Sequence, residues 1–148
     1  MPGPTVPVYR IALVREGRQQ VTSRRILSPV DAATIFRQFI GDRDREVFVV
    51  MALSTKCDVI GIHTVSIGTL ESTQVHPREV FKSVLLQNAA TIIVAHNHPS
   101  GDPTPSPQDQ TVTKRLVQAG SILGVQVHDH IILGEGERFV SLRDFGLM

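Results

Sequence analysis

This sequence contains little cysteine, no long apolar run and no large excess of charge of either sign. Its single cysteine, Cys57, excludes an internal disulfide and fits a reducing cytoplasm. We interpret Cys57 as a turn residue rather than a nucleophile, because it lies between two strand-like runs. No apolar stretch approaches the roughly 20 residues that a membrane-spanning helix needs, and the N-terminus lacks the pattern of a signal peptide. These absences predict a cytoplasmic protein with no membrane partner.

The charge balance argues against one class of partner. The 148 residues carry a formal net charge of +1, and 41% of them are hydrophobic. Such a chain is typical of one globular domain with a single core. A near-neutral charge does not predict tight binding to nucleic acid. Nucleic acid stays an alternative partner, because several arginines near the N-terminus could form a local patch: Arg10, Arg15, Arg18, Arg24 and Arg25.

Hydrophobic periodicity divides the chain into a short extension and a main domain. Residues 6–14 and 20–27 are strand-like and flank a polar turn, which predicts a strand hairpin as an extension over residues 1–25. From residue 26 to residue 148, helical and strand-like patterns alternate. We predict helices over 29–40, 77–89 and 107–119, and strands over 46–54, 59–67, 91–95, 122–133 and 138–142. This order predicts an α/β fold, a single domain with a mixed β-sheet flanked by helices.

Two histidines follow the most apolar of these strands. His96 and His98 come directly after residues 91–95, and side chains two positions apart on a strand point to the same face. Two imidazoles presented in this way can bind one zinc ion. A single histidine in a strand is more often a hydrogen-bonded structural residue. The pair, rather than either histidine alone, therefore supports a metal site.

Proline stiffens the segment that follows the histidines. Four prolines stand at positions 99, 103, 105 and 107, where each fixes the backbone φ angle and reduces the entropy that the loop loses on ordering. Asp109 comes directly after this loop and is the candidate third ligand. Two imidazoles and one carboxylate would leave the fourth zinc position open for water, which is typical of a catalytic site.

Helix capping is an alternative explanation for the end of this loop. Ser106, Pro107 and Asp109 match an N-cap, a proline at the first helical position and an acid in the first turn. Residues 28–31 repeat the pattern with no histidine nearby, so capping alone explains it equally well. One feature favours a metal-ligand role for Asp109. It shares a helix face with the apolar Val112, and a carboxylate on a buried face needs a partner.

A zinc hydrolase also needs a general base that takes a proton from water. Four carboxylates are candidates: Glu46, Glu71, Glu79 and Asp102. Glu46 begins a predicted strand on the same face as Phe48, although it also belongs to the charged run 42–46 and could simply be solvated there. Position alone does not choose among the four.

A second polar group, His128, Asp129 and His130, lies in a later predicted strand. By strand alternation His128 and His130 would share a face, where they could form a second metal site. We favour the interpretation that one of them supports the core or orients a zinc ligand from behind.

One motif in this chain resembles the metal motif of the JAMM/JAB (MPN+) metalloproteases. It reads HxHP, then six residues, then SxxD, with its defining positions at His96, His98, Ser106 and Asp109. The longer string HNHPSGDPTPSPQD is similar to the RadC branch of that superfamily. Further RadC-like segments extend the resemblance over about residues 26–148.

The resemblance implies a fold and a set of roles. The fold would be the JAB/MPN fold, a cytidine-deaminase-like α/β fold with zinc at a sheet edge. His96, His98 and Asp109 would hold the Zn²⁺ ion. Ser106 would help to stabilise the tetrahedral intermediate, and Glu46 would activate the water.

The resemblance therefore predicts a zinc-dependent hydrolase, a metallopeptidase or isopeptidase that acts on a peptide or protein. One alternative is a DNA-repair-associated factor that processes nucleic acid, and another is a non-catalytic binding module in which zinc only holds the loop. RadC proteins usually carry an N-terminal helix-hairpin-helix region, whereas only about 25 residues precede the match here. We therefore expect a standalone domain without that DNA-contacting region. The sequence leaves the oligomeric state open, a dimer included.

Overall fold

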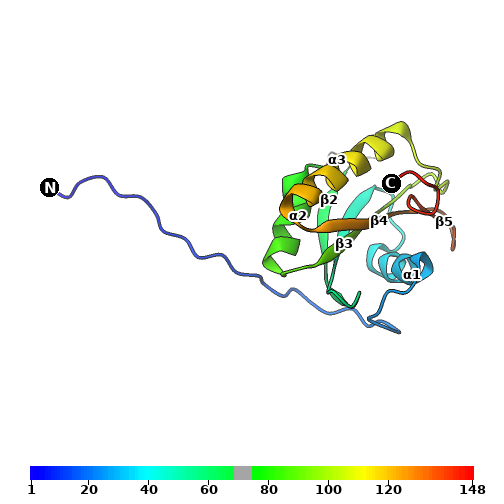
Figure 1. Ribbon diagram of the computed structural model, residues 1–148, viewed down its shortest axis with the longest axis horizontal. Coiled ribbons are helices and arrows are strands. Elements are labelled where there is room, and N and C mark those ends of the chain that lie inside the picture. Colours follow the sequence, from blue (N-terminus) through cyan, green and yellow to red (C-terminus); the bar gives the residue numbers. More distant parts are fainter. Residues whose placement is uncertain (69–74) are drawn as a thin grey trace.

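The computed structural model describes residues 1–68 and 75–148 (Figure 1). The helices and strands predicted from residue 29 onward are confirmed in type and order. The largest difference concerns the strand predicted to begin at residue 122. It begins at residue 126, because the preceding helix continues to Leu123 and ends at Gly124, whose φ of 75° is left-handed. The elements are α1 (Pro29–Ile40), β1 (Val47–Leu53), β2 (Val59–Ile67), α2 (Pro77–Leu86), β3 (Thr91–Asn97), α3 (Pro107–Leu123), β4 (Gln126–Leu133) and β5 (Phe139–Ser141).

The strands form one mixed sheet in the order β2-β1-β3-β4-β5. β1 is antiparallel to both β2 and β3, β3 is parallel to β4, and β4 is antiparallel to β5. β1 is buried along its whole length, and β3 along nearly all of it, as expected of central strands that are covered on both faces. The predicted single α/β domain with a mixed sheet is therefore confirmed.

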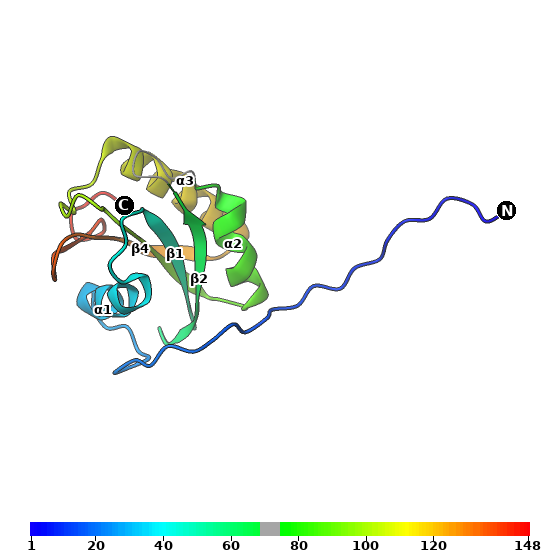
Figure 2. The ribbon, with the colours of Figure 1, turned by 180° about the vertical axis from the view of Figure 1, so that it is seen from behind.

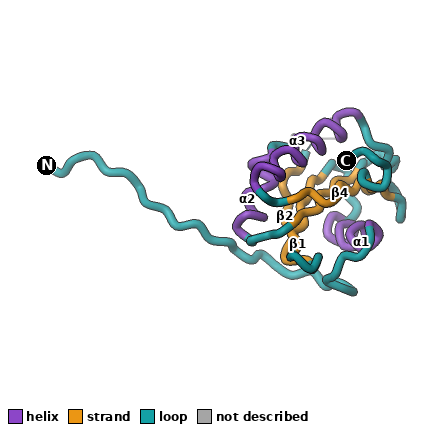
Figure 3. Tube along the Cα trace, viewed as in Figure 1, coloured by secondary structure: helices purple, strands orange, loops and turns teal. Residues whose placement is uncertain are grey.

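Helices cover both faces of this sheet, which gives three layers (Figures 1, 2 and 3). On one face α1 contributes Phe36 to a core that includes Met51 of β1. On the other face α2 and α3 contribute Phe81 and Leu116 to a core that includes Val50 of β1. Each fully buried side chain of this size stabilises the fold by about 1.5–3 kcal/mol. None of the helices in the two described ranges is both long and apolar enough to cross a membrane.

One edge of the sheet gathers the segments that the sequence marks as functional. β3 ends at this edge with Asn97, and α3 begins its crossover to the parallel strand β4 just beyond it. β1 starts at the same edge, because its antiparallel register places Phe48 opposite His96. Residue 46 is therefore brought beside the end of β3. Ligand sites in α/β sheets commonly lie outside the carboxyl ends of strands.

The N-terminal segment corrects one prediction, the hairpin over residues 6–27. Residues 1–21 contain no strand, and they leave the domain as an extended chain (Figures 1 and 2). The end of this segment contacts the domain without forming a strand. Arg25 makes an isolated bridge with Asp58 at the edge of the sheet, and Nε2 of Gln19 donates a hydrogen bond to the Ile35 carbonyl at 3.0 Å. Most of its apolar side chains are not packed, as shown by Val8 at 95% exposure, and Val21 at its end packs against the core. A two-stranded hairpin without a packed face is at best marginally stable in water, which accounts for the difference.

The proline-rich loop between β3 and α3 is held against the turn between β4 and β5. Gly101 in the loop has a φ of 90°, which favours glycine, and its carbonyl accepts a hydrogen bond from the Glu135 N–H at 2.8 Å. A Cβ atom added to Gly134 would lie 2.6 Å from the Gly101 oxygen and 2.7 Å from Cδ of Pro103. Neither a backbone atom nor a proline ring can swing away, so this contact requires glycine at position 134.

Gly134→Ala should therefore displace the loop and lower the free energy of unfolding by about 1–3 kcal/mol, the usual cost of overpacking. Gly17→Ala is the matched control, because a Cβ atom added there meets no atom within 4 Å. Chemical denaturation of both variants measures the difference. Equal stability of the two variants would show that this contact does not hold the loop.

Candidate metal centre

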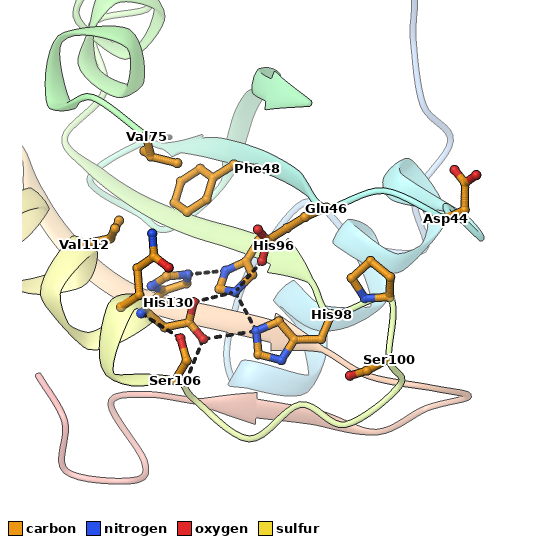
Figure 4. A pocket seen from close by; sticks show the side chains of 13 residues that line it. Asp44, Glu46, Phe48, Val75, His96, His98, Ser100, Ser106, Val112 and His130 are labelled. Atoms are coloured by element: carbon orange, nitrogen blue, oxygen red, sulfur yellow. Dashed lines mark hydrogen bonds and ion pairs between the residues drawn. The ribbon is translucent and has the colours of Figure 1, made fainter. Parts of the chain in front are cut away.

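Four residues that the sequence singles out meet at this edge of the sheet. Figure 4 labels Glu46, His96 and His98 among them. Glu46 directly precedes β1, His96 lies near the end of β3, His98 follows β3, and Asp109 lies in the first turn of α3. One potential ligand atom from each residue lies within 4.8 Å of the others. The predicted ligands and the predicted base are thus brought together, although they come from separate segments of the chain.

The three predicted ligands have the spacing of a metal site. Nε2 of His96 lies 3.1 Å from Nε2 of His98. Asp109 places Oδ1 at 3.2 Å from His96 Nε2 and Oδ2 at 3.0 Å from His98 Nε2. Ligand atoms bound at about 2.0–2.1 Å around a tetrahedral zinc ion lie roughly 3.3–3.4 Å apart. The donor set and its spacing therefore fit a zinc ion, with the cluster slightly contracted.

A backbone contact determines which ring nitrogen of His98 faces this cluster. Nδ1 of His98 lies 2.8 Å from the carbonyl oxygen of Asp102, and a carbonyl oxygen can only accept a hydrogen bond. Nδ1 therefore carries the proton, and in the neutral ring the Nε2 lone pair faces Asp109. This is the tautomer that a metal ligand needs.

Asp109 makes contacts of both kinds that the sequence left open, with the start of α3 and with the two histidines. Its Oδ2 accepts a hydrogen bond from the Ser106 N–H at 2.9 Å, while its own N–H donates to Ser106 Oγ at 3.0 Å. Asp31 makes the same capping box with Ser28 at the start of α1. Within the described chain no histidine is among the hydrogen-bond or ion-pair partners of Asp31. Capping therefore does not require imidazoles. The contacts with His96 and His98 distinguish Asp109 from Asp31.

Asn97, between the two histidines, is a positioning residue that sequence reasoning missed. Its buried side chain accepts a hydrogen bond from the Val47 N–H at 2.7 Å and donates one to the Arg45 carbonyl at 3.0 Å. These residues flank Glu46, whose Oε1 lies 3.5 Å from His96 Nε2. Asn97 thus holds the backbone that carries Glu46. The sequence shows an amide at this position, but its partners lie about 50 residues away and depend on the strand register.

The second histidine pair does not share a face, which corrects another expectation. The pairing of β3 with β4 skips His128, and this bulge leaves His128 exposed while His130 is fully buried. Nε2 of His130 lies 2.8 Å from Nδ1 of His96, directly behind the metal cluster. Asp129 is also buried, and its carboxylate accepts a hydrogen bond from the Ser141 hydroxyl. Of the two alternatives, His130 therefore fits the one that orients a ligand.

The cluster favours positive charge at its centre. Burial by itself raises the pKa of Asp109, but the hydrogen bonds with His96 and His98 outweigh it and hold that pKa well below its ordinary range. Burial lowers the pKa of His98, but the Asp109 carboxylate and the Asp102 carbonyl outweigh it, so the net pKa is raised. Burial holds the pKa of His130 well below its ordinary value. A proton and a metal ion would therefore compete for His98.

The cluster opens into a cleft of about 690 Å³. Phe48, Val75 and Val112 contribute apolar walls (Figure 4). Ser106 lies beside Asp109 at the start of α3. Ser106 Oγ accepts the Asp109 N–H, so its own hydroxyl proton can be donated to another acceptor. A molecule bound in the cleft can therefore reach the four-residue cluster.

The other candidate bases lie away from the four-residue cluster. Glu79 pairs with Lys82 on the surface of α2 at 3.1 Å. The Asp102 side chain is 64% exposed and accepts hydrogen bonds from Thr104. Glu71 lies outside the described residues. Of the candidates that the structure describes, Glu46 alone lies at the cluster.

Comparison with known proteins agrees with this geometry. The family model described as the RadC-like JAB domain matches residues 26–147. This match covers most of the chain, and the chain belongs to the RadC-like JAB domain family. The resemblance predicted from the motif is thereby confirmed, and the mixed sheet with three helices is consistent with a JAB/MPN fold.

Curated relatives share most of this chain. A UPF0758 protein of Methanosarcina barkeri is 43% identical over 141 residues, which cover 95% of this chain and 61% of that protein. A UPF0758 protein of Moorella thermoacetica is 52% identical over 123 residues, or 83% of this chain and 53% of that protein. A UPF0758 protein of Desulfitobacterium hafniense is 45% identical over 142 residues, which cover 93% of this chain and 62% of that protein. The chain thus spans between 53% and 62% of the length of these relatives.

The two capping boxes provide a matched test of the metal centre. Asp109→Asn and Asp31→Asn should each weaken one helix start, with a cost of about 0.5–2 kcal/mol. Only Asp109→Asn should also lower zinc affinity. The loss should exceed the roughly 10–100-fold that follows from removing a residue that hydrogen-bonds a ligand without contacting the metal. Competition with a chromophoric chelator measures the affinity. Equal zinc affinities for the two variants would contradict the assignment of Asp109 as a ligand.

Proposed function

We propose that this chain is a JAMM-type zinc hydrolase, a metallopeptidase or isopeptidase that cleaves an amide bond. One observation carries the proposal: the Nε2 atoms of His96 and His98 and the carboxylate of Asp109 converge with metal-site spacing, with Glu46 3.5 Å from His96. The cluster opens into a cleft on its remaining side. Three protein ligands beside open space are typical of catalytic zinc rather than structural zinc.

The donor set favours zinc among the common metal ions. Two imidazole nitrogens and one carboxylate oxygen are borderline ligands, whereas Mg²⁺ and Ca²⁺ prefer sites built from oxygen. His96, His98 and Asp109 would hold the ion. A zinc ion bound there would supply a Lewis acid that lowers the pKa of a coordinated water toward about 7.

The residues around this centre can perform the proton transfers of amide hydrolysis. Glu46 would accept a proton from the attacking water at a carboxylate oxygen and later deliver it to the leaving amine. Asn97 would keep this carboxylate in place by holding the backbone on both sides of it. The Ser106 hydroxyl would donate a hydrogen bond to the oxyanion, and one such donor is typically worth about 3–4 kcal/mol.

The charges that line the cleft favour an amide over a phosphodiester substrate. Asp44, Glu46 and Asp109 line the cleft, and its lining, within the described residues, includes neither lysine nor arginine. A phosphodiester carries a negative charge, which these carboxylates would repel, whereas an amide is neutral. The lining of the cleft therefore favours a peptide or protein substrate over a nucleic acid.

We also propose a cytoplasmic location for the protein, because the unpaired thiol of Cys57 favours a reducing compartment.

Glu46→Gln should leave zinc bound and lower kcat by about 10²–10⁴-fold, because glutamine cannot accept the proton. His98→Ala should lose the metal. Glu79→Gln, which changes a surface carboxylate of α2, is the matched control and should keep full activity. Zinc content is measured by mass spectrometry, and turnover is measured on a library of internally quenched peptides and ε-linked isopeptides.

Three outcomes would contradict the proposal. Full activity of Glu46→Gln would show that the base is wrongly assigned. A second outcome is that the wild type and its Glu46→Gln variant both bind zinc and cleave none of the amide substrates. That result would favour the non-catalytic binding module. Cleavage of a supercoiled plasmid in place of the peptides would favour the nucleic-acid alternative.

A further inference from the structure

Three buried polar side chains form a continuous chain behind the metal cluster. Nδ1 of His96 lies 2.8 Å from Nε2 of His130, and Nδ1 of His130 lies 2.6 Å from Oγ1 of Thr113. Oγ1 of Thr113 lies 2.7 Å from the carbonyl oxygen of Asp109, one helical turn earlier in α3. All three residues are buried, since His96, His130 and Thr113 are 2%, 0% and 1% exposed. The chain therefore starts at one predicted ligand and ends at the backbone of another.

The carbonyl end of this chain determines where each proton lies. The Asp109 carbonyl oxygen carries no proton, so the hydrogen bond at 2.7 Å must contain the hydroxyl proton of Thr113. Thr113 Oγ1 then has only lone pairs to offer to His130. Nδ1 of His130 must therefore be the donor in the bond between them, and the proton of the His130 ring lies on Nδ1.

The same argument continues to His96. His130 is fully buried, and within the described residues its hydrogen-bond partners include no carboxylate, so a charged ring would be costly and the neutral ring holds only one proton. With that proton on Nδ1, Nε2 of His130 can only accept. The donor is then Nδ1 of His96, which leaves the Nε2 lone pair of His96 facing His98 and Asp109.

We propose that His130 and Thr113 are positioning residues that hold His96 in its metal-binding tautomer. Thr113 selects the proton position on His130, and His130 selects the proton position on His96. The proposal rests on the metal-holding part of the proposed function and is independent of hydrolysis. It also gives the buried Thr113 hydroxyl a role beyond its hydrogen bond to the Asp109 carbonyl within α3.

The packing around His130 keeps the ring from rotating out of this chain. The Phe48 ring stacks on the His96 ring, with their centroids 5.8 Å apart and an angle of 9° between them. The same Phe48 ring packs against the His130 ring in a T-shaped arrangement, with their centroids 5.5 Å apart. Both imidazoles are thus confined by one aromatic side chain, and their orientation does not depend on the hydrogen bonds alone.

Thr113→Val tests the proposal, because valine has nearly the shape of threonine but cannot accept a hydrogen bond from His130. Zinc affinity should fall by about 10–100-fold, the usual effect of losing a group behind a ligand. Thr113→Ser restores the hydroxyl and should restore the affinity. Thr111→Val is the matched control, because Thr111 also donates to the carbonyl four residues earlier in α3, at 3.1 Å, but is exposed.

Nuclear magnetic resonance gives a readout that a merely structural role would not change. Long-range ¹H–¹⁵N spectra of the zinc-loaded wild-type protein should show His130 protonated at Nδ1 and unprotonated at Nε2. Affinities are compared at a temperature at which circular dichroism shows all variants to be folded. Should Thr113→Val fail to fold, the spectrum of the wild-type protein and the Thr113→Ser variant still decide the proton position.

Several outcomes would overturn the proposal. A zinc-loaded wild-type protein with the His130 proton on Nε2 would overturn it, and so would a Thr113→Val variant that binds zinc as the wild type does. In those cases the proposed function stands, because the wild type binds the metal. A wild-type protein that takes up no zinc would instead end the proposed function, and this inference with it.

Discussion

The site depends on one electrostatic constraint: hydrogen-bond acceptors converge without a proton to separate them. The Asp102 carbonyl keeps the proton of neutral His98 on the far side of its ring, and both oxygens of Asp109 face the two histidines. Nitrogen and oxygen lone pairs at such short distances repel one another unless a cation lies between them. A metal ion, or a proton in its absence, removes that repulsion. The raised pKa of His98 and the lowered pKa of Asp109 express the same demand.

The fold meets this demand because rigid elements carry each group. The antiparallel register of β1 with β3 delivers Glu46 to the end of the strand that carries His96. The crossover from β3 to β4 returns the chain through α3, whose first turn carries Asp109. The loop between β3 and α3 is packed against Gly134. This packing fixes the start of α3 and so the position of Asp109, although the loop is long. The capping box that starts α3 also aims its carboxylate, and stability and site geometry are thereby served by the same hydrogen bonds.

The sequence by itself determined much of this protein. Apolar periodicity predicts the helices and strands after residue 28, because a buried face imposes its period on the chain wherever an element packs. The spacing of His96 and His98 predicts a shared face at a strand end, because alternation in a strand is local geometry. The histidine, serine and aspartate spacing also predicts the family that the comparison confirms. These features depend on neighbours within a few residues or on a motif of short range.

Only the tertiary structure decided the rest, because it depends on contacts between distant segments. Position alone could not choose Glu46 among the carboxylates, since its place beside His96 follows from strand pairing across 50 residues. The bulge that separates His128 from His130 is a property of the β3–β4 pairing and breaks the alternation that a single strand would obey. The N-terminal hairpin failed for the converse reason. A strand-like pattern becomes a strand only when another segment pairs with it along its length and buries one face. Within the described chain residues 6–21 have no strand partner, and the end of the segment has only the isolated bridge from Arg25 to Asp58.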